Sequence, residues 1–134
     1  MTSTNSQFVS TRNHGFQMTF DNGITVSVQF GQGNYCERKN LHLSYRGDMD
    51  AATPIITSKN AEIAIWHKDS DTWFQFESDQ VKGWVTTNEV ADWITIIKIA
   101  RDIEHLRNIA IAGGLLIEDE GPAVDSAGFT EEDR

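Results

Sequence analysis

The sequence predicts an α+β fold, in which an antiparallel sheet of about four to five strands packs against one long C-terminal helix. Two observations lead to this prediction. Before residue 86, apolar and polar residues alternate in short runs, which is the period of a half-buried strand. After residue 86, apolar residues recur at helical spacing up to a pair of glycines. The 134 residues are enough for one domain with its own core.

The stretch "GFQMTFDNGITVSVQF", residues 15–30, predicts the first hairpin. A two-residue turn at Asn22-Gly23 would set each apolar row opposite a polar row. A three-residue loop that includes Asp21 sets Phe20 opposite Ile24 and gives one continuous apolar face. We therefore expect the three-residue loop, with Gly23 in the left-handed conformation. The opposite face is polar but uncharged, which suits contact with a chain or a ligand. It consists of Gln17, Thr19, Thr25, Ser27 and Gln29.

Further strands are expected after this hairpin. The run "LHLSYR", residues 41–46, alternates apolar and polar side chains and predicts a short strand. In "AEIAIWHKDSDTWFQFE", the segments 61–67 and 72–77 predict a second hairpin around a polar turn. The segment "KGWV" then leads to the helix.

The helix has the clearest local signal in the chain, "VTTNEV". Thr86 is the expected N-cap and Glu89, three residues later, closes a capping box. Val85 and Val90 are spaced as a hydrophobic staple around it. The predicted helix runs from residue 87 to about residue 112, where Gly113-Gly114 ends it.

This helix carries two apolar stripes, although packing on one sheet requires only one. The stripe expected to face the core consists of Val90, Trp93, Ile94 and Ile97. The second stripe points elsewhere and consists of Ile96, Ile99, Ile103, Leu106 and Ala110. Either the second stripe contacts a partner chain, or the helix breaks near residues 98–101 and its second half folds back. We favour self-association, most simply as a homodimer.

Charge is distributed unevenly along the chain. The net charge is -9, and residues 118–134 contain seven acidic residues against one arginine. We expect a flexible N-terminal arm over residues 1–13, a single α+β domain over 14–117 and an acidic disordered tail over 118–134. The nearly neutral body argues against direct nucleic-acid binding, which requires a basic face.

Cysteine usage and hydropathy predict a cytoplasmic protein. The chain has a single cysteine and its N-terminus has no basic start or apolar run for export. No apolar stretch approaches the roughly 20 residues that span a bilayer. We therefore expect no disulfide framework and no membrane contact.

Few residues are arranged for catalysis. Cys36 and His42 would be the obvious nucleophile and base, but Glu37 beside Cys36 disfavours a thiolate, and His42 falls on the polar face of its predicted strand. The four histidines show no paired spacing of the kind that zinc ligands have. We expect no enzyme activity, no metal site and no cofactor.

The glycine-rich loop "GQGNYC" is the candidate ligand site. Such a loop after a strand can present backbone amides to a phosphate. It lacks the third glycine and the Lys-Ser/Thr of nucleotide-binding motifs, and no helix is expected directly after it. The candidate residues are Gly31, Gln32, Gly33, Asn34, Tyr35 and Cys36.

The run "HGFQMTFDNGITVSVQFGQGNYC", together with "AEIAIW" and "KGWVTTNEVADWI", resembles small uncharacterised proteins of tailed bacteriophages and prophages. The shared pattern is GF-MTF-NG-TVSVQ-G-GNYC, and the resemblance covers about residues 14–97. It implies no catalytic residue. It implies a context, that of small phage proteins in the host cytoplasm, which bind host proteins or signalling nucleotides.

Two functions are therefore expected. The first is a non-enzymatic phage-type binding protein that modulates a host protein, in host takeover or anti-defence. The alternative is a ligand-binding protein that sequesters a small nucleotide-like molecule near the GQGNYC loop.

Overall fold

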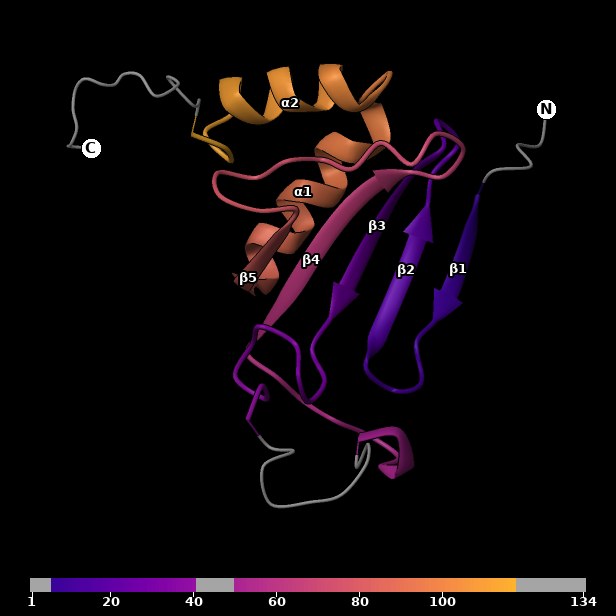
Figure 1. Ribbon diagram of the computed structural model, residues 1–134, viewed down its shortest axis with the longest axis vertical. Coiled ribbons are helices and arrows are strands. Elements are labelled where there is room, and N and C mark those ends of the chain that lie inside the picture. The colour runs from indigo at the N-terminus through magenta and orange to yellow at the C-terminus, as the bar shows by residue number, and fades with distance from the viewer. Residues whose placement is uncertain (1–5, 41–49, 118–134) are drawn as a thin grey trace.

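The computed structural model describes residues 6–40 and 50–117 (Figure 1). Within these residues, five antiparallel strands form one sheet in the order in which they occur along the chain, and two helices follow them. This confirms the α+β class and the antiparallel sheet. The strands are β1 (Gln7–Ser10), β2 (Gly15–Thr19), β3 (Ile24–Gln29), β4 (Asn60–His67) and β5 (Val81–Thr86). The helices are α1 (Thr87–Ile99) and α2 (Ile103–Ala112), and a 3-10 turn covers Asp50–Ala52.

The turn between β2 and β3 has the register that the apolar pattern predicts, in which Phe20 lies opposite Ile24 and residues 21–23 form the loop. Met18 lies opposite Val26, and the Phe20 amide donates to the Ile24 carbonyl at 3.0 Å. Gly23 has a φ of 86°, the left-handed conformation that a glycine adopts without strain. A Cβ at this position would also lie 2.8 Å from the Nε2 atom of His67. The register therefore depends on a glycine at this position.

The expected flexible arm over residues 1–13 is wrong for residues 7–10, which form β1. Phe8 lies opposite Met18 and Val9 opposite Gln17. A four-residue strand has too little periodicity to be recognised in a polar segment, and β1 forms because β2 offers it a free edge to pair with. The expected strand over 41–46 and the acidic tail over 118–134 lie outside the described residues.

The second hairpin forms only at its turn. The His67 amide donates to the Thr72 carbonyl at 2.9 Å and the Phe74 amide to the Ile65 carbonyl at 2.8 Å. Beyond Phe74 the chain leaves the sheet, and β5 pairs with the first half of β4 instead. The prediction of a strand over 72–77 is therefore wrong past its start, because Phe74 and Phe76 turn inward onto Trp93.

The capping box at the start of α1 is confirmed: Thr86 accepts from the Glu89 amide, and the Glu89 side chain accepts from the Thr86 amide. The prediction of one long helix is wrong, because the helix breaks at Ala100, which is extended with a ψ of 144°. Asn22 of the first hairpin loop donates to the carbonyls of Ile97 and Ala100, at 2.8 and 2.7 Å. This side chain stabilises the end of α1 by bonding carbonyls that lack helical partners.

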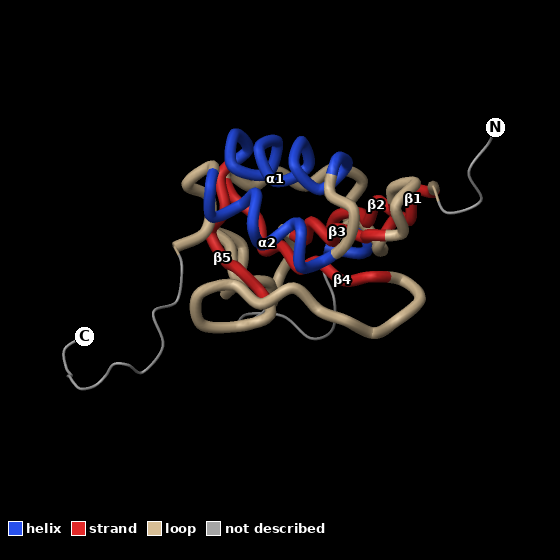
Figure 2. The backbone as a smooth tube through the Cα atoms, turned by 90° about the horizontal axis from the view of Figure 1, so that it is seen from above, coloured by secondary structure: helices blue, strands red, loops and turns tan. Residues whose placement is uncertain are grey.

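A new helix begins after the break and folds back. Asp102 is the N-cap of α2 and accepts from the His105 amide at 2.7 Å. Figure 2 shows α1 along one face of the sheet, and in Figure 1 α2 crosses the end of the sheet. Trp93 of α1 is fully buried, with the rings of Phe74 and Phe76 edge-on at 5.5 and 5.3 Å. Because of the break, residues of both apolar stripes pack into one core.

Candidate functional site

The GQGNYC loop uses most of its own backbone amides. The Gly31 amide donates to Asn34 Oδ1 at 2.9 Å and the Gly33 amide to the Lys39 carbonyl at 3.1 Å. The Cys36 amide donates to the Asn34 carbonyl at 2.8 Å. A phosphate would have to displace these acceptors to bind the loop through its amides. The loop is thus fixed by its own hydrogen bonds.

The carboxylate of Asp50, from outside the loop, bonds one of the loop's amides. Its side chain is completely buried, accepts from the Gln32 amide and pairs with Arg38 at 2.6 Å. Burial alone would raise the pKa of the Asp50 carboxyl. Hydrogen bonds from Arg38 and Gln32, and the charge of Arg38, outweigh it and hold the pKa below its ordinary value. No sequence motif predicts the Arg38–Asp50 pair, whose residues lie 12 positions apart.

Cys36 is a buried structural side chain. It is 1% exposed, and its thiol points at the Gly31 carbonyl at 3.7 Å. His42 lies outside the described residues. Among the residues that the structure describes, no three His, Cys, Asp or Glu side chains gather closely enough to hold a metal ion.

Tyr35 is the candidate residue of the loop that faces solvent most clearly. Its ring stacks on Trp84 of β5, with centroids 5.8 Å apart and planes at 29°, and the two residues are 43% and 53% exposed. The ammonium of Lys39 lies 5.4 Å from the Tyr35 ring centroid. We call these three side chains the Tyr35–Trp84 platform.

The backbone holds this platform in a strained conformation. Trp84 has a φ of 52°, which bulky residues rarely adopt, and its amide donates to the Tyr35 carbonyl at 2.8 Å. Gly83 lies against Tyr35, where a Cβ would come within 2.6 Å of the Tyr35 Cβ. The register of β4 with β5 shifts at this point, as at a β-bulge, and such irregularities re-aim side chains. One hint is visible in the sequence, a tryptophan directly after a glycine.

The uncharged face of the first hairpin is less open than the sequence predicts. Thr19, Thr25 and Ser27 are buried, and the hydroxyls of Thr19 and Thr25 lie 2.7 Å apart. Gln29 donates to the Ser27 hydroxyl at 3.1 Å. These polar groups bond one another, and are therefore not free to bind a ligand. Gln17, which lies opposite Val9 in β1 and Ser27 in β3, is half-buried.

A second aromatic pair borders the same face. Trp66 lies opposite Thr25 in the sheet and packs on Trp73, with centroids 4.8 Å apart. Trp73 is 40% exposed. It lacks the positive φ of Trp84, so it offers a matched control for the platform.

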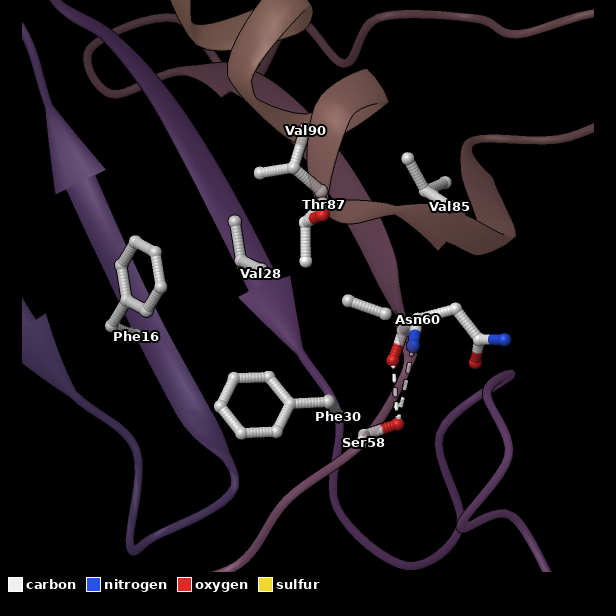
Figure 3. A pocket seen from close by; sticks show the side chains of 9 residues that line it. Phe16, Val28, Phe30, Ser58, Asn60, Val85, Thr87 and Val90 are labelled. Carbon is white, nitrogen blue, oxygen red and sulfur yellow. Dashed lines mark hydrogen bonds between the residues drawn. The ribbon is translucent and has the colours of Figure 1, made fainter.

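An apolar cavity of about 280 Å³ opens on the helix-covered side of the sheet, beside the start of α1 (Figure 3). Its polar rim residues are used within the chain: the Ser58 hydroxyl donates to the Asn60 carbonyl, and Asn60 Oδ1 accepts from the Glu37 amide. The cavity is slightly smaller than most small-molecule sites. Its walls include Phe16, Val28, Phe30, Val85 and Val90. It suits an apolar side chain better than a nucleotide.

The five residues predicted for self-association do not form one exposed stripe. Leu106 and Ala110 are fully buried in the chain's own core, so a partner chain cannot contact them in this fold. Ile96 and Ile103 are partly buried against the same core, and Ile99 is 61% exposed. The helix break places four of the five residues, all but Ile99, in or against the chain's own core, as the second alternative requires.

No protein-family model matches this chain, and no curated protein or solved structure matches it significantly. Neither described helix is long and apolar enough to cross a membrane.

Proposed function

We propose that this chain is a non-enzymatic binding protein of the phage type, which modulates a host protein in the host cytoplasm, and that the Tyr35–Trp84 platform is its anchor. The observation that carries the proposal is Trp84. This residue is more than half exposed and has a positive φ that costs a bulky side chain stability.

The platform has the chemistry of an interface hot spot. Tryptophan and tyrosine are enriched among the residues that dominate binding energy, because each buries a large rigid surface and keeps a polar group. The stack pre-orders both rings, since Tyr35 and Trp84 are also joined by a backbone hydrogen bond of 2.8 Å. Little side-chain entropy then remains to be lost on docking.

The alternative function, capture of a small nucleotide-like molecule, would use the same platform. A base could stack on the exposed rings, and Lys39 could face a phosphate. The occupied amides of the loop and the buried Asp50 leave this ligand few other donors. We therefore favour a protein partner.

The test compares Trp84→Ala with Trp73→Ala in a pull-down from a lysate of the host bacterium. Both variants remove an exposed tryptophan that packs on another aromatic ring, and circular dichroism checks that both fold. We expect the amount of protein captured by Trp84→Ala to be at least ~10-fold lower than that captured by wild type. Trp73→Ala should capture as much as wild type. Equal capture by wild type, Trp84→Ala and Trp73→Ala would refute the proposal that the Tyr35–Trp84 platform is the anchor. Native mass spectra that show a bound nucleotide, lost in Trp84→Ala, would support the alternative function.

A further inference from the structure

β1 lies at an edge of the sheet, and none of the described strands pairs with its outer side. The Thr11 amide donates to the Gly15 carbonyl at 3.2 Å, so Thr11 points its backbone groups toward β2. Because these groups alternate along a strand, Val9 points the same way, and Phe8 and Ser10 point outward. β1 lies at the end of the strand order, with no described strand beyond it.

Apart from its short length of four residues, this edge lacks the usual protections against pairing. Residues 7–10 contain no charge, no proline and no bulge, and all four are exposed. Native proteins normally place such features on an edge strand to prevent association. A row of outward amides and carbonyls on an uncharged strand accepts another strand.

The side chains on this edge are self-complementary. Phe8 is 77% exposed and heads an apolar row that crosses the sheet through Met18 and Val26 to Ile65. A two-fold axis at Phe8 would set it opposite Phe8 of a second copy and join the two rows. The chain carries a net charge of -9, so two copies approach best where the strand carries no charge, as along residues 7–10.

We propose that a second copy of this chain pairs antiparallel with β1, centred on Phe8, so that one sheet runs through both copies. Phe8 of each copy would exchange two backbone hydrogen bonds, and Ser10 would lie opposite Ser6 of the other copy. The helices leave room for this, because α1 packs on β3, β4 and β5, and β1 and β2 project beyond it (Figures 1 and 2). This interface is at the opposite edge from the Tyr35–Trp84 platform, so the two proposals can fail separately.

The register can be tested by cross-linking in the full chain. In the proposed pair, the Cα atoms at position 8 lie about 5.5 Å apart, within disulfide range. The Cα atoms at position 10 lie about 14 Å apart, out of range. Phe8→Cys should therefore form a disulfide-linked dimer under mild oxidation, and Ser10→Cys should not. Wild-type protein is the blank, because its Cys36 is buried.

Sedimentation equilibrium of the unmodified chain and of Phe8→Lys gives a second measurement. We expect wild-type protein to dimerise with rising concentration, and Phe8→Lys to raise the dissociation constant at least ~10-fold, because two like charges would face each other. Cross-linking of Phe8→Cys and Ser10→Cys to the same extent would overturn the proposal. A wild-type chain that stays monomeric at every concentration would overturn it too, and the edge would then be free for a foreign strand.

Discussion

The two edge strands of the sheet, β1 and β5, differ in whether their outer backbone groups are hydrogen-bonded within the described chain. At β5 the Trp84 amide donates to the Tyr35 carbonyl, and the strand is irregular next to Gly83. The edge is thus occupied by a loop of the same chain. At β1 the four residues are regular, uncharged and exposed.

The difference shows what each edge can bind. The β5 edge has its backbone partly bonded, so it offers side chains, the rings of Tyr35 and Trp84, to a partner. The β1 edge offers backbone amides and carbonyls, which only another strand satisfies well. One edge therefore suits a different protein and the other a second copy.

The largest effect is expected at the buried pair that fixes the loop against β5. Asp50→Asn leaves the Arg38 guanidinium, which is mostly buried, without its counter-charge. We expect the free energy of unfolding to fall by about 3 kcal/mol, measured by urea denaturation at neutral pH. Lys68→Ala, which removes an exposed ion pair with Asp69, is the control and should change little. Equal losses in the two variants would show that the Asp50 pair does not fix this edge.

The same carboxyl predicts a pH dependence. Its pKa is lowered in the folded chain relative to the ordinary value of 3.8, so its ionised form stabilises the fold. That stabilisation is present above the unfolded pKa and is lost as the pH falls through the lower folded pKa. Below about pH 4, wild-type stability should fall more steeply with decreasing pH than that of Asp50→Asn. Parallel curves from urea melts would contradict this role of Asp50.

At the other edge, proline should distinguish inward from outward amides. Val9→Pro removes an amide that faces β2, and we expect a loss of about 2 kcal/mol in the free energy of unfolding. Phe8→Pro removes an outward amide, which edge strands tolerate, so in dilute protein the change should stay within about 0.5 kcal/mol. Thermal melts compare the two. A larger loss of stability in Phe8→Pro than in Val9→Pro would mean that the inward and outward amides along β1 are assigned wrongly.

The smallest effect concerns the strain at Trp84. Trp84→Ala and Trp84→Gly both remove the stacked ring, but only glycine adopts a φ of 52° without strain. We expect Trp84→Gly to be more stable than Trp84→Ala by about 1 kcal/mol, the reverse of the usual order in a strand. If alanine is the more stable, the positive φ does not persist without the tryptophan.

Local signals predicted much of the fold. The alternation around Asp21-Asn22-Gly23 specified the hairpin register, because a slip by one residue would expose every apolar side chain. The capping box specified the first residue of α1. Both signals lie within a few residues of what they determine.

What the sequence did not predict depends on distant contacts. The helix break relies on Asn22, which bonds carbonyls 75 and 78 positions later. The loop relies on Asp50, and β1 relies on a partner strand rather than on its own propensity. At the candidate site, the sequence singled out Tyr35 in its loop, but its stacking on Trp84 requires the sheet to bring β5 beside the loop.

Amide hydrogen exchange, measured residue by residue at low and high protein concentration, tests the contrast between the edges most directly. The Trp84 amide, bonded to Tyr35, should be protected equally at both concentrations. The Phe8 amide should exchange rapidly in dilute protein and slow down as the concentration rises. Protection of Phe8 that does not depend on concentration, or rapid exchange of Trp84, would contradict the account of an open β1 edge and a closed β5 edge.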